Sequence, residues 1–139
     1  FDGCIKLTEV TVPEGSTMLP DYAFSECYYI TKINLPSTLK NIGNYAFSDC
    51  TALDSVTISY GVEKIGGGSF ADCYSLESLH IPDSVTDIDD AAFRGCGSLV
   101  DITIPKNVVN IGTRVFSGCV KLSAFKVAED NPSFMVRNA

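Results

Sequence analysis

Apolar residues recur along this chain with one fixed period from end to end. Cysteine and phenylalanine show it best, because neighbouring copies of each stand 23 residues apart. The cysteines are Cys4, Cys27, Cys50, Cys73, Cys96 and Cys119, and the phenylalanines are Phe1, Phe24, Phe47, Phe70, Phe93 and Phe116. Such a repeat is typical of a solenoid, in which each coil buries its apolar face against its neighbours. We expect residues 1–139 to form one domain of about six coils.

Within each repeat, apolar and polar residues alternate in a short stretch after the cysteine. In the fifth repeat the apolar residues are Ile102 and Ile104, and Pro105 follows. A spacing of two with β-branched residues predicts a short strand, and proline ends it because it cannot donate a ladder hydrogen bond. A second apolar pair in each coil, such as Val85 and Ile88, favours a two-residue strand ladder on another side.

A residue type that often caps a helix stands shortly before each phenylalanine. Side chains or free backbone at such positions satisfy the amide donors of a first helical turn. The residues are Asp21, Asn44, Gly67, Asp90 and Thr113. We therefore expect one helical turn per coil, and the predicted fold class is a right-handed α/β solenoid. A parallel β-sheet forms one face, and short helical turns with the second ladder form the other.

The last repeat departs from the pattern. Asn131 and Pro132 replace the valine turn, and Phe134 stands where isoleucine is expected. Two explanations stay open: a capping coil, which repeat arrays need to cover an open core, or a departure into another module.

The cysteines favour buried free thiols over disulfides. Equivalent residues of stacked coils are about 4.8 Å apart, whereas a disulfide needs Cβ atoms about 3.5 to 4.5 Å apart. No Cys-x-x-Cys pair or group of histidines is present, so the sequence does not favour zinc.

Composition narrows the classes of partner. The formal charge is -7, and the basic residues are scattered, which argues against nucleic acid. No apolar run approaches the roughly 18 residues of a membrane-spanning helix, so we expect no membrane insertion by this segment. The chain starts at Phe1, partway through a repeat and without methionine, which favours a piece of a longer protein.

The repeat resembles one class of leucine-rich repeat. The strings Leu99 to Pro105 and Val109 to Cys119 carry its Ile-x-Ile-Pro strand, Ile-Gly turn and final cysteine. They are similar to the BspA-like, or Treponema-type, repeats over essentially the whole chain. The resemblance implies a cell-surface or secreted protein, most often of a host-associated microbe, and some members of that family bind host matrix proteins such as fibronectin or fibrinogen. It implies no catalytic residues and no cofactor.

The outward strand positions form the first candidate binding surface, because solenoids usually bind partners on their sheet. We single out Lys32, Thr57, His80, Asp101 and Thr103 there. Glu9 is expected to pair with Lys32 across the ladder. The competing explanation is that these residues are ordinary solvated strand positions.

Tyr28, Tyr29 and Tyr74 form the second candidate surface, since exposed tyrosine is common at interfaces. The alternative is partial burial of these rings over the coil. Ser55, His80 and Asp101 are the residue types of an acyl-transfer triad, but an open sheet offers neither a pocket nor oxyanion donors. The acidic residues match no calcium-binding loop.

Two functions from different classes follow from these patterns. The favoured one is a non-enzymatic recognition or adhesion module for a protein or glycan partner, with no metal or cofactor. The alternative is a spacer that projects another domain from the cell surface and has no ligand of its own. We expect the chain to be monomeric.

Overall fold

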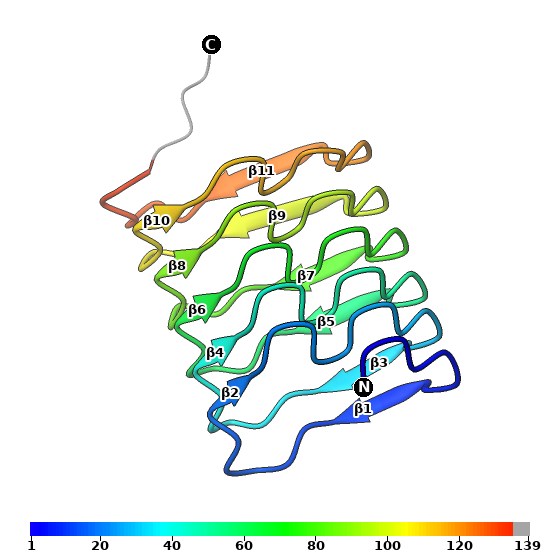
Figure 1. The fold of residues 1–139 in the computed structure, drawn as a ribbon. Coiled ribbons are helices and arrows are strands. Elements are labelled where there is room, and N and C mark those ends of the chain that lie inside the picture. Colours follow the sequence, from blue (N-terminus) through cyan, green and yellow to red (C-terminus); the bar gives the residue numbers. More distant parts are fainter. Residues whose placement is uncertain (135–139) are drawn as a thin grey trace.

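The structure, a computed structural model, describes residues 1–134 (Figure 1). Within these residues the chain forms eleven short parallel strands and no helix. Each of the first five coils contributes one longer and one shorter strand, and successive coils stack in sequence order (Figure 1). The predicted solenoid is therefore confirmed, with five coils that carry both strands and a sixth that carries only the longer one.

The longer strands form a ladder along one side, which we call the long ladder. Its members are β1 (Glu9–Thr11), β3 (Lys32–Asn34), β5 (Ser55–Thr57), β7 (Ser78–His80), β9 (Asp101–Ile104) and β11 (Ala124–Val127). They are hydrogen-bonded in pairs, β1 with β3, β5 with β7 and β9 with β11. Each pair is in register by one repeat, as in Val56 opposite Leu79.

The shorter strands form a continuous five-stranded parallel sheet, the short ladder. It runs through β2 (Met18–Leu19), β4 (Asn41–Ile42), β6 (Lys64–Ile65), β8 (Asp87–Ile88) and β10 (Asn110–Ile111). One residue of each strand, such as Ile65, points into the core, and the other, such as Lys64, points outward. The expected two-residue ladder is thus confirmed.

The core consists of columns of identical or similar side chains. Phenylalanine rings stack from Phe1 to Phe116 with centroids 5.4 to 5.8 Å apart. The thiols of Cys27, Cys50, Cys73 and Cys96 are fully buried and free, and those of Cys4 and Cys119 are half-buried. The prediction of buried free thiols is confirmed for the inner four. Each inner thiol also donates to the carbonyl of a phenylalanine in the coil before it, as Cys73 does to Phe47 at 3.2 Å.

The predicted helical turns, and with them the α/β class, are wrong for the described residues. The segment after each expected cap is a series of turns. In these turns every second backbone amide donates to a carbonyl of the next coil. In the second coil, the amide of Tyr45 donates to Gly67 at 2.8 Å, and that of Phe47 donates to Ser69 at 2.8 Å. Tyr45 and Asp49 have left-handed φ angles of 55° and 59°. A helix needs donors that bond within the coil and continuous right-handed φ, so it cannot form here.

The residues expected to cap helices instead bridge adjacent coils. The side chain of Asp21 accepts the backbone amide of Asn44 at 2.8 Å, and Asn44 accepts that of Gly67 at 2.8 Å. Asp90 accepts the amide of Thr113 at 2.7 Å. We call this column the Asx ladder. The chemistry that predicted caps, a short side-chain oxygen for a free amide, is present, but its donor lies one repeat further on.

The two ends of the core differ. Phe1 is 79% exposed at the first coil and stacks on Phe24. At the other end Asn131 replaces a buried valine, and its amide nitrogen donates to the carbonyls of Pro105 and Val108 at 2.8 and 3.1 Å. Its Oδ1 accepts the amides of Ser133 and Phe134. This set of bonds supports the capping explanation over residues 131–134.

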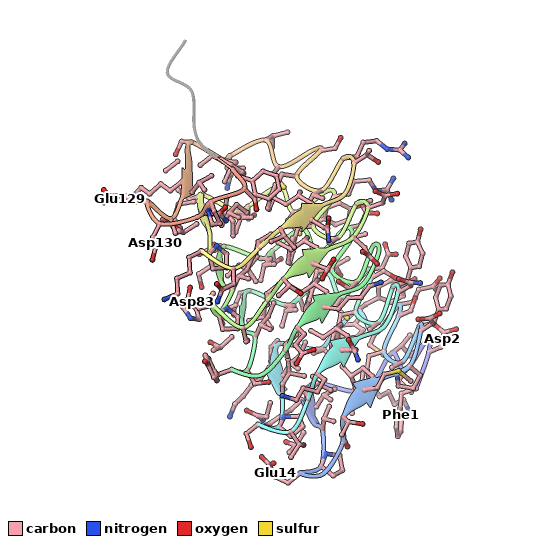
Figure 2. The ribbon with its side chains drawn as sticks, turned by 90° about the vertical axis from the view of Figure 1, so that its left-hand side faces the viewer. Phe1, Asp2, Glu14, Asp83, Glu129 and Asp130 are labelled. Carbon is pink, nitrogen blue, oxygen red and sulfur yellow. The ribbon has the colours of Figure 1, made fainter. Side chains whose placement is uncertain are left out.

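Exposed carboxylates line one edge of the solenoid. Figure 2 shows Glu14, Asp83, Glu129 and Asp130 pointing away from the core. These residues lie in the turns that follow the long-ladder strands. Lys106, in the same turn column, pairs with Asp83 at 3.7 Å.

Candidate functional site

The candidate residues of the long ladder all lie on its outward side. Thr57 stands opposite His80 in the register of β5 and β7. Asp101 and Thr103 are on β9, which lies next to β7 in the stack but belongs to a different hydrogen-bonded pair. All five residues singled out here are exposed. Alternation along each strand explains this, because inward residues such as Val56 and Ile102 are buried in the core.

Lys32 differs from the other four because its charge is already balanced. Its Nζ lies 3.4 Å from Oε1 of Glu9 on the neighbouring strand, which confirms the expected pair. The same carboxylate oxygen accepts a hydrogen bond from Asn34 at 3.0 Å. Both partners of the ion pair are exposed, so it contributes at most about 1 kcal/mol to stability.

The structure brings three of the predicted residues together at one hollow. His80, Asp101 and Thr103 line a depression of about 350 Å³ between β7 and β9, which we call the His80 hollow. Its apolar floor includes Ile81 and Pro105. Within residues 1–134, the three polar side chains make no hydrogen bond or ion pair. Lys32 and Thr57 lie outside the hollow.

Sequence reasoning missed part of this lining. Asp83 and Ala128 also border the hollow, although they follow the strands in the repeat. The hollow lies where β7 and β9 are not paired in one sheet. A strict repeat predicts equal pairing between all coils, so no signal in the sequence marks this position.

The register also bears on the acyl-transfer triad. Ser55 stands opposite Ser78, and Thr57 stands opposite His80. Ser55 and His80 are therefore diagonal neighbours, which lie about 7 to 8 Å apart on a sheet. Proton transfer requires hydrogen-bond reach, so this arrangement does not form a nucleophile and base.

The three candidate tyrosines lie at a turn edge, which we call the tyrosine edge. Tyr29 is 60% exposed and Tyr74 is 54% exposed, so these rings are not covered by the coil. Tyr28 donates to Oε2 of Glu26 at 3.3 Å. The nearby carboxylate of Asp72 is the main cause that raises the pKa of Tyr74.

Stacked carboxylates lie behind this edge. Glu26, Asp49 and Asp72 occupy the same position of successive coils. Burial raises the pKa of Asp49, and the charges of Asp72 and Glu26 raise it further. Asp72 is held by Arg94, whose guanidinium lies 2.8 Å from its carboxylate. Among residues 1–134, no group of three His, Cys, Asp or Glu side chains is arranged to hold a metal ion.

The geometry thus describes a rigid array with varied side chains on its outer surface. A family model described as BspA type leucine rich repeat region matches residues 1–99 with six copies. The chain belongs to this family. The 23-residue coil, the buried cysteine and the paired ladders described above are therefore features of a BspA-type repeat protein.

Solved structures of similar proteins agree with this membership. A leucine-rich repeat protein of T. pallidum is 32% identical and superposes with a TM-score of 0.88 over 91% of this chain. One from Bacteroides ovatus is 33% identical with a TM-score of 0.81, and a leucine-rich cell surface protein of Faecalibacterium prausnitzii is 35% identical with a TM-score of 0.68. Each also matches 91% of this chain.

The chain is shorter than these relatives. It spans 59% of the T. pallidum protein, 39% of the Bacteroides protein and 40% of the Faecalibacterium protein. No curated protein matches the sequence. Within residues 1–134, no helix has the length and apolar character needed to cross a membrane.

Proposed function

We propose that this BspA-type chain is a non-enzymatic recognition module that is displayed on a cell surface or secreted. Its partner is a protein or glycan, with host matrix proteins among the candidates. The proposal rests first on the His80 hollow, where three polar side chains without intramolecular partners surround an apolar floor. Binding sites combine such concave apolar surface with a few polar groups that fix orientation.

The surface location is supported by relatives. The similar protein of Faecalibacterium prausnitzii is described as a cell surface protein. Repeat proteins of this kind generally serve protein interaction or surface display, and their ladders keep the presented side chains in fixed positions. A rigid surface binds with a smaller loss of conformational entropy than a mobile one.

The tyrosine edge is the second surface of the proposed module. Its rings offer large contact area at low entropic cost, and the carboxylates behind them favour a cationic partner. Binding there would depend on Tyr28, Tyr29 and Tyr74, not on the long ladder. Variants of the two surfaces therefore separate their contributions.

The direct test is a binding screen with the purified chain against immobilised fibronectin, fibrinogen and a panel of glycans. We expect saturable binding to at least one of them. The double substitution His80→Ala and Thr103→Ala should weaken it about tenfold or more, whereas Thr11→Ala, in the same outward column on β1, should leave it unchanged. Tyr74→Ala reports separately on the tyrosine edge.

The spacer is the alternative outcome. The phenylalanine stack and the Asx ladder would equally suit a rod that only holds another domain away from the cell. No saturable binding to any member of the panel, with the folded state confirmed by a cooperative melting transition, would favour the spacer over the recognition module.

A further inference from the structure

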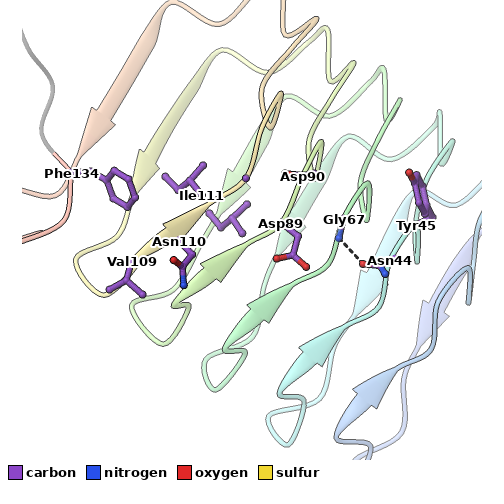
Figure 3. A pocket seen from close by; sticks show the side chains of 11 residues that line it. Asn44, Tyr45, Gly67, Asp89, Asp90, Val109, Asn110, Ile111 and Phe134 are labelled. Atoms are coloured by element: carbon purple, nitrogen blue, oxygen red, sulfur yellow. Dashed lines mark hydrogen bonds between the residues drawn. The ribbon is translucent and has the colours of Figure 1, made fainter.

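A second hollow lies beside the short ladder, on a different side of the coils from the outward strand positions (Figure 3). It has a volume of about 650 Å³ and is lined by residues from the second to the sixth coil. We call it the Asp90 hollow. Polar residues on its walls include Asn44, Asp89 and Asn110, and apolar surface comes from Val109 and Phe134.

The Asx ladder is interrupted inside this hollow. Asn44 accepts the amide of Gly67, and Asp90 accepts the amide of Thr113, as each rung requires. Gly67 stands between them and has no side chain, so it cannot accept the amide of Asp90. Within residues 1–134 this amide has no acceptor. Figure 3 shows the Asn44–Gly67 rung as a dashed line.

The space at the interruption is large enough for the missing group. A Cβ added to Gly67 would lie 3.4 Å from the carbonyl oxygen of Asp90 and 3.5 Å from Oδ1 of Asn44, which are ordinary contacts. The glycine is therefore not required by packing at this position. An external oxygen could occupy the same space and accept the free amide.

The charges around the hollow restrict what such a ligand could be. Oδ2 of Asp89 lies 3.0 Å from Nζ of Lys64, and Oδ1 of Asp90 already accepts two bonds from Thr113. The carboxylates retain further acceptor capacity, because each can accept about four hydrogen bonds. An anionic ligand would be repelled by Asp90, which has no cation within salt-bridge distance among the described residues.

We propose that the Asp90 hollow binds a neutral polyhydroxylated chain, that is, a glycan without acidic groups. One hydroxyl oxygen accepts the amide of Asp90 in place of the missing rung. Other hydroxyls donate to Asp89 and Asp90, since a hydroxyl both donates and accepts. The apolar C–H face of a sugar ring packs against Val109 and Phe134. This site is separate from the His80 hollow and does not depend on the function proposed above.

The test is a titration of the ¹⁵N-labelled chain, followed by amide NMR, with neutral oligosaccharides. Suitable probes are linear oligomers of α- and β-linked glucose, mannose and N-acetylglucosamine. We expect the amide signal of Asp90 to shift in a saturable way with at least one of them. Signals on β7 and β9 should not move, which distinguishes this site from the His80 hollow.

Two substitutions at one position make the test specific. Gly67→Asn should restore the rung, fill the space and weaken binding about tenfold or more, the value of one hydrogen-bonded contact. Gly67→Ala adds only a Cβ and leaves the amide of Asp90 free, so binding should stay within about threefold. Both variants keep the long ladder unchanged.

The proposal is wrong if no oligosaccharide shifts the amide of Asp90, or if Gly67→Asn binds as well as the unmodified chain. It is also wrong if the signal moves only with a neutral peptide such as an alanine oligomer, because the site would then take a polypeptide. The titration of the unmodified chain decides the matter even if a variant fails to fold. Loss of binding to matrix proteins in the screen above would leave this proposal untouched.

Discussion

Single residues in the left-handed backbone region explain why the coils lack helices. Each of the inner coils has two in the turns around its phenylalanine, such as Tyr45 and Asp49 in the second and Ala91 and Gly95 in the fourth. A non-glycine residue there costs about 1 to 2 kcal/mol, although Asp and Asn tolerate the region better. The amides between them bond to the next coil, as that of Phe47 does to Ser69. The backbone strain is thus offset by hydrogen bonds that join the coils.

The ionised carboxylate of Asp49 lowers the stability of the folded chain at neutral pH. Burial and the neighbouring carboxylates raise its pKa in the folded chain above that of the unfolded chain. The folded state therefore binds the proton more tightly, and the contribution of Asp49 to stability falls as pH rises through the interval between the two values. Asp49→Asn should raise the free energy of unfolding at pH 7 by about 0.5 kcal/mol.

Thermal denaturation between pH 3 and pH 8 measures this effect. The gain of Asp49→Asn should disappear below the ordinary carboxyl value of 3.8, where both states are protonated. Asp72→Asn is the matched control, because it removes the ion pair with Arg94 and should give no gain. A gain for Asp49→Asn that is the same at every pH would contradict the electrostatic cause.

The thiols give a second prediction at this scale. Burial raises the pKa of Cys50 to about 12 and raises that of Cys73 as well, so these groups stay protonated and inert. At pH 8 a thiol reagent should modify half-buried Cys4 first, and half-buried Cys119 more slowly because burial raises its pKa. The four inner thiols should react only after denaturation. Mass spectrometry after alkylation locates the modified residues. Fewer than six reactive thiols in unreduced denaturant would indicate a disulfide and contradict the structure.

At the scale of elements, the Asx ladder connects coils that the sequence pattern treats as separate units. The pattern identified its members through their side-chain chemistry but assigned them to helix caps. A helix cap and a rung of the Asx ladder both place a side-chain oxygen near a free amide. The sequence alone does not show whether that amide is two residues or one repeat away. By contrast, both strand ladders were predictable from apolar residues. Alternation, as in Ile102 and Ile104, predicted the long ladder, and the second apolar pair, such as Val85 and Ile88, predicted the short ladder.

The interrupted rung yields a prediction for stability. Gly67→Asn should supply an acceptor to the amide of Asp90 and restrict the unfolded chain, which together raise the free energy of unfolding by about 1 kcal/mol. Gly66→Asn is the contrasting control. Its Cβ would lie 2.6 Å from the carbonyl oxygen of Ile42, so it should destabilise by about 2 kcal/mol.

Chemical denaturation of both variants measures the difference. Equal stability of Gly67→Asn and the unmodified chain would show that the amide of Asp90 is already satisfied. That result would also weaken the proposed glycan site, since both depend on a free donor.

Across the whole molecule, stability depends on stacking along the axis. Phe70 is fully buried between Phe47 and Phe93, with ring centroids 5.4 and 5.5 Å away. Phe70→Ala should cost about 3 to 5 kcal/mol of unfolding free energy, the usual range for a buried phenylalanine. Phe1→Ala should cost less than about 1 kcal/mol, because this ring stacks on one side only.

The chain has no tryptophan whose fluorescence could report unfolding. Urea titration followed by circular dichroism measures both values. Similar losses for the two variants would mean that the first coil is as well covered as the centre. The far-ultraviolet spectrum from the same experiment should lack the helical minimum at 222 nm, in agreement with the absence of helix in residues 1–134.

The repeat revealed the solenoid, the buried thiols and the outward columns, but not the positions where coils differ. His80, Asp101 and Thr103 were identified as outward residues from alternation alone. They converge on one hollow between β7 and β9, which belong to different hydrogen-bonded pairs although the repeat predicts equal pairing throughout. The Asp90 hollow likewise includes Gly67, a glycine at a position where other coils carry Asp, Asn or Thr. A period describes what coils share, and binding surfaces arise where they do not.

The most direct test of the account is an alanine profile across the outward side of the long ladder. It uses the strongest ligand of the binding screen and single substitutions of Lys32, Thr57, His80, Asp101 and Thr103. We predict that the dissociation constant rises about tenfold for the three residues of the His80 hollow and less than about threefold for Lys32 and Thr57. An equal rise at all five positions, or no rise at any of them, would contradict the assignment of recognition to the His80 hollow.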